Sequence, residues 1–341
     1  MKSNYNFSLP IYPDLTPDYI NGVFIPFLKK YKDNISDLYF TVRMDPFNQD
    51  VMGTPFSEED IITMISNALV IQHETGIQIS PVFNNIFIQP SLENLEIFIT
   101  NFRRLYKAGI RSCTIPFTSW LYFNRFQQEF PDVYLKNTVV NAVDKPREVY
   151  ELYKAGFDYV NLDRNLIRSQ TQLKEIYLAR DKAEKDFNKK LKLSILWNES
   201  CIGNCPIQKE HFQYNACNNP DPKKMDKNKV FFKSPLNQVS CMKWEKEDKN
   251  YIFKKANIIF HPVFMKGLES IDVFKMHGRE NFSVFQNSLK IIEGVLDGTL
   301  KDEFSIYKDK YQIEDNTFYK WITKTVDCNF DCWNCQECSL I

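Results

Sequence analysis

The sequence predicts an α/β protein: a TIM-like (β/α)8 barrel with a cysteine-bearing insertion after the seventh strand and a cysteine-rich C-terminal tail. Eight short apolar runs alternate with amphipathic stretches, which is typical of repeated strand–helix units. The tetrapeptide YKAG twice ends a helix-like stretch, at Gly109 and Gly156, and a strand-like run follows each time. An open doubly wound sheet is the alternative. Its dinucleotide-binding version has little support, because no G-x-G-x-x-G motif follows the first strand.

The expected strands are short runs rich in β-branched and aromatic residues, the composition that pleated sheets favour. In chain order they are Tyr5–Ile11, Leu38–Met44, Gln78–Asn84, Arg111–Phe117, Tyr134–Val140, Asp158–Asp163, Lys192–Asn198 and Ile271–Met276.

Three of the intervening stretches carry signals for helix ends. The stretch SEEDIITMISNALVIQHETG begins with a capping residue, Ser57, has acidic residues in its first turn and stops at Gly76. The stretch SLENLEIFITNFRRLYKAG begins at Ser91 and ends in the first YKAG. The stretch KPREVYELYKAG has Pro146 near its start and ends in the second YKAG.

The strand–helix alternation breaks once, between the seventh and eighth expected strands. About 70 residues rich in Pro, Asn, Asp and Lys intervene there, and loops of that length are usually functional or disordered. Because the insertion follows a strand, we expect it on the C-terminal face of the barrel, where barrel enzymes place their active sites. We therefore divide the chain into a barrel, residues 1–300, which includes the insertion 199–256, and an appendix, residues 301–341.

The charge of the chain is balanced, with 43 basic and 43 acidic residues. The balance excludes a global electrostatic footprint for nucleic acid or for an anionic membrane, although a local basic patch and an RNA substrate stay open. The start, MKSNYNFSLPIYPDL, has no apolar signal core, and no run approaches about 18 apolar residues. We expect a cytoplasmic protein with no membrane partner; the oligomeric state is not indicated.

Eight of the nine cysteines fall into two sets of four. Without a secretory signal, disulfides lack an oxidising compartment, so the clustered spacing favours metal ligation. The ninth, Cys113, lies in an expected strand, where we interpret it as a small buried apolar residue.

The first set is Cys201, Cys205, Cys217 and Cys241, spaced C-x3-C-x11-C-x23-C along the insertion. Four thiolates can bind zinc or an iron–sulfur cluster. Zinc favours close C-x2-C pairs, which this set lacks. The irregular spacing therefore favours a [4Fe–4S] cluster, with zinc or no metal as the alternatives.

The second set is Cys328, Cys332, Cys335 and Cys338, spaced C-x3-C-x2-C-x2-C within the last residues. Its first part matches the cluster motif of radical-SAM enzymes, but that motif normally follows the first barrel strand, whereas here it ends the chain. We reject that assignment. The tail is better interpreted as a ferredoxin-like second [4Fe–4S] site, with zinc as the alternative.

Two segments resemble a known family. The segment NESCIGNCPIQKEHF is similar to the N-E-x-C-x-x-x-C-P-x-x-x-x-H segment of divergent members of the collagenase-like peptidase family U32. The later segment IDVFKMHGRE resembles that family's hydrophobic–Asp–x–hydrophobic–Lys–Ile–x–Gly–Arg signature. The two segments come in the family's order, and a long helix-like stretch follows the second. The chain departs from the better-known members at Pro206 and at His277, where glutamate is usual.

The resemblance implies a TIM-like barrel that carries a four-cysteine [4Fe–4S] cluster. It also implies a type of reaction, because members of this family include oxygen-independent hydroxylation enzymes. These enzymes act on ubiquinone precursors or RNA bases, and prephenate is implicated as the oxygen donor in some. Protease activity is also claimed for members.

Four residues are candidates for catalytic roles. Glu199 adjoins the first cysteine segment at a strand end, where it would transfer protons or bind substrate; a helix-capping role is the alternative. His211 lies on the same loop as a donor to a sulfide or to substrate, or as a surface histidine. Lys275 and Arg279 flank the end of the eighth strand, where either would hold a substrate carboxylate or phosphate. Ion pairs with barrel carboxylates are their alternative.

Strand-end polar residues point toward the active face of a barrel. Asp163 and Arg164 end the sixth expected strand, and Arg43 and Asp45 end the second. Each of these residues alone is weak evidence for a site.

Together these features favour an iron–sulfur enzyme that performs redox or oxygen-independent hydroxylation chemistry on a small-molecule or RNA substrate at the barrel mouth. An electron-donor protein is a candidate partner. A peptidase, and a non-catalytic iron–sulfur or zinc sensor or scaffold, are the alternatives.

Overall fold

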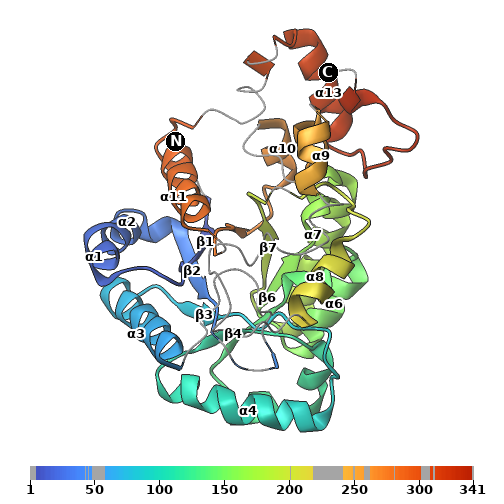
Figure 1. Ribbon diagram of the computed structural model, residues 1–341. Helices are drawn as coiled ribbons and strands as arrows, with labels where there is room; N and C mark the ends of the chain where they lie inside the picture. The colour runs from blue at the N-terminus through green and yellow to red at the C-terminus, as the bar shows by residue number, and fades with distance from the viewer. Residues whose placement is uncertain are drawn as a thin grey trace.

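The computed structural model describes residues 5–42, 44, 46–47, 58–199, 201–217, 241–248, 250–256, 262–279, 281–300, 308–309 and 312–339. Within these residues, eight parallel strands form one sheet in the order β3-β2-β1-β8-β7-β6-β5-β4. A parallel bridge between Val82 and Thr114 joins β3 to β4, so the sheet nearly closes on itself. Helices surround the strands (Figure 1). The chain is therefore a TIM-like (β/α)8 barrel, and the predicted fold class is confirmed.

The strands are β1 (Phe7–Pro10), β2 (Ile35–Phe40), β3 (Ile79–Pro81), β4 (Ser112–Ile115), β5 (Tyr134–Asn137), β6 (Tyr159–Leu162), β7 (Lys192–Leu196) and β8 (Val273–Lys275). Each overlaps one predicted run. Strand β2 begins before its predicted start at Leu38, because Ser36 and Asp37 interrupt the apolar pattern there.

The helices of the barrel are α1 (Pro17–Tyr19), α2 (Ile25–Lys30), α3 (Glu58–Thr75), α4 (Leu92–Lys107), α5 (Arg125–Glu129), α6 (Pro146–Ala155), α7 (Gln170–Phe187) and α11 (Phe282–Leu296). The insertion and tail add α8 (Gln208–Cys217), α9 (Cys241–Glu247), α10 (Pro262–Gly267) and α13 (Asp315–Thr325).

The predicted helix ends agree with the structure where it describes them. The Ser91 hydroxyl accepts a hydrogen bond from the Asn94 N–H at 3.1 Å and so caps α4. Gly109 and Gly156 follow α4 and α6 with φ of +103° and +115°, a backbone conformation that glycine adopts without strain. The proposed cap of α3, Ser57, lies outside the described residues.

The barrel interior contains a buried ion pair. Lys136 on β5 lies 3.0 Å from Asp37 on β2, and the Ser8 hydroxyl on β1 donates to the same carboxylate at 2.6 Å. Strands β2 and β5 are not neighbours in the sheet, so these side chains meet across the inside of the barrel. Burial lowers the pKa of Lys136, and the Asp37 charge opposes that shift.

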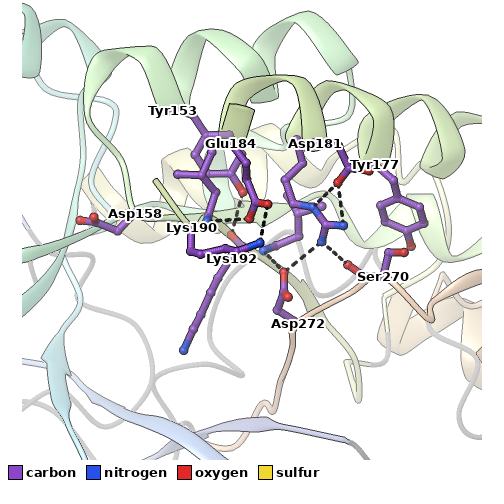
Figure 2. A network of polar contacts seen from close by, with 12 residues as sticks. Tyr153, Asp158, Tyr177, Asp181, Glu184, Lys190, Lys192, Ser270 and Asp272 are labelled. Atoms are coloured by element: carbon purple, nitrogen blue, oxygen red, sulfur yellow. Dashed lines mark hydrogen bonds and ion pairs between the residues drawn. The ribbon is translucent and has the colours of Figure 1, made fainter. Parts of the chain in front are cut away.

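A polar network fastens α7 to the N-terminal ends of β7 and β8 (Figure 2). The Asp272 carboxylate accepts the Leu193 N–H at 2.7 Å and lies 3.4 Å from Arg180, whose guanidinium also donates to the Ser270 carbonyl at 2.9 Å. Because this end of a barrel is opposite the usual catalytic face, the network supports the fold rather than the chemistry.

The C-terminal appendix packs on the insertion and on the segment after β6. The Trp321 ring of α13 lies 5.0 Å from the ring of Phe253, which belongs to a 3-10 turn (Tyr251–Lys254) in the insertion. The Asp327 carboxylate accepts from the Thr171 N–H at 3.1 Å, at the start of α7. The described tail is thus held against the barrel by side chains from two different segments.

Candidate functional site

A pocket of about 70 Å³ opens at the C-terminal ends of the strands. This volume holds a few water molecules or a small organic group. It is lined by residues at or just after the C-terminal ends of β2, β3, β5, β6, β7 and β8, with one side chain from α8. The lining residues are Tyr39, Thr41, Val82, Asn84, Val139, Val140, Arg164, Leu196, Glu199, Phe212, Lys275, His277 and Arg279. The insertion therefore contributes to the C-terminal face of the barrel, as predicted.

Three basic side chains meet in this pocket from two separate strand ends. Arg164 follows β6, Lys275 is the last residue of β8, and Arg279 follows shortly after. The Arg279 guanidinium donates to the Thr41 hydroxyl at 2.8 Å, and its carbon lies 5.2 Å from the centre of the Tyr39 ring. These contacts with residues at the C-terminal end of β2 fix the orientation of the Arg279 guanidinium.

Lys275 is buried, with 6% of its surface exposed. Its amine lies 4.5 Å from the centre of the Tyr39 ring, a cation–π contact. Burial is the largest cause that lowers the pKa of Lys275, to about 7, and the charges of Lys136 and Arg279 lower it further. Asp37 acts in the opposite direction, but that carboxylate is already paired with Lys136.

The alternative interpretation of Lys275 and Arg279 was an ion pair with barrel carboxylates. Neither residue has a carboxylate oxygen within 4.0 Å in the part of the chain that the structure describes. Both remain candidates to bind an anion.

Glu199 pairs with Arg164 across the pocket. The Arg164 side chain is 4% exposed and the Glu199 side chain 13% exposed, so the pair is largely withdrawn from water. The helix-capping alternative for Glu199 is not what the structure shows, because its carboxylate faces a guanidinium. Besides Glu199, the pocket lining contains the basic residues Arg164, Lys275 and Arg279.

His211 lies on α8 but is not among the residues that line the pocket. Burial lowers its pKa. The next residue, Phe212, faces the pocket instead, with its ring 5.9 Å from the Arg164 guanidinium carbon. Asp163 also lies away from the pocket lining; its carboxylate accepts the Asn165 N–H at 2.6 Å, and burial raises its pKa.

Sequence reasoning missed several lining residues, namely Tyr39, Thr41, Asn84 and Phe212. The first three alternate along the ends of β2 and β3, so the period-two pattern was the signal that could have found them. Arg43 and Asp45, proposed for the same strand end, lie outside the described residues.

The first cysteine segment is fixed by backbone pairing within the insertion. The Cys201 carbonyl accepts the Ala256 N–H at 2.9 Å, and the Gly203 N–H donates to the Lys254 carbonyl at 3.0 Å. Cys201 and Cys205 are half-buried. The backbone of Cys217 ends α8 and that of Cys241 begins α9, but their side chains lie outside the described residues.

Cys113 is fully buried in β4, and burial raises the pKa of its thiol. This agrees with its interpretation as an apolar core residue. Among the residues that the structure describes, no three His, Cys, Asp or Glu side chains are already placed to hold one metal ion.

The tail cysteines surround a buried arginine. Arg168, in the 3-10 turn Arg164–Arg168 after β6, is 1% exposed. Its guanidinium interacts electrostatically with the thiols of Cys338 and Cys328. The Cys332 thiol in turn interacts with the thiols of Cys338, Cys328 and Cys335, and burial raises its pKa. The Trp321 indole N–H donates to the Cys338 sulfur at 3.2 Å.

The Nε and Nη2 atoms of Arg168 make no hydrogen bond of good geometry within the described part of the chain. Negative charge on the neighbouring thiols would stabilise this buried cation and accept from its unused N–H donors. Four thiolates around a metal centre supply that charge. Thiolate charge on Cys328, Cys332 and Cys338 would compensate the Arg168 cation.

The tail also lies against the first cysteine segment. The Asn204 amide donates to the Asn329 carbonyl at 3.3 Å, and Phe330 covers Gly203 so closely that no Cβ would fit there. The two cysteine segments, far apart in the sequence, are thus neighbours in the structure.

No helix among the described residues combines the length and apolar character needed to cross a membrane. No family model matches the chain, and neither does any curated protein.

Solved structures do show similarity. The chain is similar to the U32 peptidase Mk0906 at 11% identity with a TM-score of 0.48, over 80% of this chain and 93% of that chain. It is similar to deoxyribose phosphate aldolase from Aeropyrum pernix at 10% identity and a TM-score of 0.36, over 57% and 76% of the two chains. The YdjI aldolase from Escherichia coli K12 gives 11% identity and a TM-score of 0.36, over 87% and 92%. The assignment of a barrel rests on the strand order of this chain.

Proposed function

We propose that this chain is an iron–sulfur enzyme that binds a small anionic substrate, or an anionic group of an RNA, at the C-terminal face of its barrel. The observation that carries the proposal is the charge of the pocket. Arg164, Lys275 and Arg279 line it together with a single described carboxylate, Glu199, which is already paired with Arg164. An anion entering this pocket would meet Lys275 and Arg279, which have no carboxylate partner among the described residues.

Arg279 is the group best placed to hold that anion. Its contact with Thr41 uses one N–H at 2.8 Å, whereas a guanidinium has five donors in a planar fork that matches carboxylate and phosphate oxygens. The Tyr39 ring supports the plane of the guanidinium. Phe212 from α8 covers the same space and would exclude water around the bound anion, which strengthens the charge interactions.

Cys201, Cys205, Cys217 and Cys241 would hold a [4Fe–4S] cluster beside this pocket, and Cys328, Cys332, Cys335 and Cys338 a second one, with zinc as the alternative in the tail. Such a centre supplies one-electron or Lewis-acid chemistry when bound. Glu199 stands close to Cys201 in the chain and also lines the pocket, which supports placing the first centre near the substrate. Redox or oxygen-independent hydroxylation of that substrate, with an electron-donor protein, is the reaction we propose.

Anion binding is tested with inorganic phosphate and acetate as probes, by calorimetry on the wild-type protein and on Arg279→Ala. Charge-assisted hydrogen bonds are worth about 1.5–3 kcal/mol, so we expect the variant to bind at least ten times more weakly. The matched control is Arg125→Ala, which removes an exposed arginine paired with Glu96 and should leave binding unchanged. Equal binding by all three proteins would contradict the proposal.

The metal content is tested by anaerobic purification and iron analysis. We expect about eight irons per chain, and about four after deletion of residues 327–341. Loss of one zinc with unchanged iron would show that the tail is a structural zinc site. Loss of all iron would show that the two cysteine sets form one interdependent centre. A colourless wild-type protein with stoichiometric zinc would refute the redox proposal.

A further inference from the structure

We infer that Lys275 is a nucleophile that forms a covalent imine with the carbonyl carbon of its substrate, an aldehyde or ketone that also carries a carboxylate or phosphate. The inference rests on the proposed function for the anionic part of the substrate, which Arg279 would hold. It adds the chemical class of the reacting group and a covalent role for one side chain.

The Lys275 amine is buried beside the pocket. Lys275 ends β8 and lines the pocket, yet only 6% of its surface is exposed. Side chains this buried are seldom lysine unless a carboxylate pairs with them. Here the nearest candidate, Asp37, is engaged by Lys136 at 3.0 Å and by the Ser8 hydroxyl at 2.6 Å. Lys275 is therefore a buried amine beside an open pocket, with no ion-pair partner in the described part of the chain.

Burial and the basic groups near the amine favour its neutral form, whereas its contact with the Tyr39 ring favours the ammonium. The charged and titratable groups that face it are Asp37 and Tyr39 from β2, Lys136 from β5, and, from the strand ends, Arg164, Glu199, His277 and Arg279. The basic members outnumber the acidic ones, and both acidic members are paired with other residues. This environment disfavours an ammonium and leaves a lone pair that can attack a carbonyl.

The fraction of each lysine that is neutral at pH 7 favours one lysine over the others. With a pKa of about 7, roughly half of Lys275 is neutral at pH 7. A lysine at the ordinary value of 10.5 is neutral in roughly three molecules per ten thousand. The neutral fraction of Lys275 at pH 7 is thus about a thousandfold larger than that of a surface lysine.

The reaction balances without another reagent. The Lys275 nitrogen attacks the carbonyl carbon, a C–N bond forms, and a proton moves from nitrogen to oxygen to give a carbinolamine. The C–O bond then breaks and water leaves, which produces the imine. No electrons are gained or lost overall, and hydrolysis reverses the steps to regenerate the amine. His277 lines the same pocket and would carry the protons.

The experiment uses two small aldehydes of similar size, glyoxylate, which is anionic, and acetaldehyde, which is neutral. Each is incubated with the wild-type full chain at pH 7 in the presence of cyanoborohydride, which reduces an imine to a stable secondary amine. Peptide mass mapping then identifies the modified lysines. We expect glyoxylate to modify Lys275 first, apart from the N-terminal amine. Lys255, also buried but outside the pocket, should stay unmodified and serves as the internal control.

Two variants complete the test. Arg279→Ala should slow glyoxylate labelling of Lys275 at least tenfold more than it slows acetaldehyde labelling, because only glyoxylate has a carboxylate, whereas the loss of the Arg279 charge raises the pKa of Lys275 and slows both reactions alike. Lys275→Met should abolish labelling at that position; the wild-type map decides the inference even where this variant does not fold. Labelling spread evenly over surface lysines would overturn the inference while phosphate and acetate binding still upheld the proposed function. If Arg279→Ala slows the labelling of Lys275 by glyoxylate no more than its labelling by acetaldehyde, Lys275 is a nucleophile but Arg279 does not hold the carboxylate of the substrate.

Discussion

Replacing Arg168 by methionine should change the stability of the protein in opposite directions in its metal-free and metal-loaded forms. Arg168 is 1% exposed, and its guanidinium carbon lies 5.7 Å from the centre of the Trp321 ring and 5.4 Å from that of Phe330. Burial lowers the pKa of its guanidinium, and the thiols of Cys338 and Cys328 are the groups that oppose this shift. Metal-free thiols carry little negative charge, so the cation is then poorly compensated.

The magnitude follows from two opposing terms. Burying an unpaired ion costs several kcal/mol even after relaxation, while two cation–π contacts of a desolvated cation return about 2 kcal/mol each. Methionine fills a similar space with no charge and keeps contact with both rings. We therefore expect Arg168→Met to stabilise the metal-free protein by about 1–3 kcal/mol. In the metal-loaded protein the cysteines are charged thiolates. Arg168→Met then removes the N–H donors beside them, which should lower the free energy of unfolding by about 1–3 kcal/mol.

The assay is thermal unfolding of anaerobically prepared protein before and after chelation, with iron analysis of each sample. A change of this size moves the melting temperature by a few degrees in a chain of this length. The matched control is Arg103→Met, because Arg103 is exposed and paired with Glu129; it should shift both forms by less than about 1 kcal/mol. If Arg168→Met lowers the melting temperature equally with and without metal, Arg168 is an ordinary packing residue and the tail does not need its charge.

Three further predictions concern the barrel and its contact with the tail. Asp37→Asn should destabilise the protein by about 3–5 kcal/mol in thermal melts, because it leaves the buried lysine partner on β5 without its counter-charge. Gly203→Ala should release the tail, seen as faster hydrogen exchange over residues 328–339, because its Cβ would overlap the Phe330 ring; Gly22→Ala, which meets nothing within 4 Å, is the control, and equal exchange in both variants would contradict the contact. The folded pKa of Lys275 is about 7, below its unfolded value, so the unfolded state binds more protons above pH 7. Stability should therefore rise by about 1.4 kcal/mol per pH unit from pH 7 toward pH 10, and Lys275→Met should remove that slope in denaturant titrations at several pH values.

The fold was largely predictable because barrel strands are covered on both faces. A run such as Lys192–Leu196 has four buried residues in succession, and such runs stand out in the sequence against the amphipathic helices between them. Glycine after α4 and α6 marked the helix ends, since a positive φ is required there. The predicted start of β2 is too late for a simple reason. Asp37 is buried inside the barrel, whereas a sequence pattern interprets a charged residue as the end of an apolar run.

The candidate site was predictable only in part. Position at a strand end identified Glu199, Lys275 and Arg279, which all line the pocket, whereas position on the cysteine-bearing loop suggested His211, which does not line it. The cysteine sets remain a prediction from spacing. Phe212 was missed because nothing about an aromatic residue in the sequence distinguishes a pocket wall from a core contact.

The sequence by itself determined the alternation of strands and helices, the two groups of cysteines and the basic residues after β8, since each is a property of neighbours along the chain. The tertiary structure alone decided which of those residues meet. It paired Asp37 with Lys136 across the barrel, so that no described carboxylate pairs with Lys275, and it turned Arg168 toward the cysteines of the tail. Charge and burial act through distance in space and through the exclusion of water. The protonation of Lys275 and the surroundings of Arg168 therefore depend on side chains that closure of the barrel brings together from distant parts of the chain.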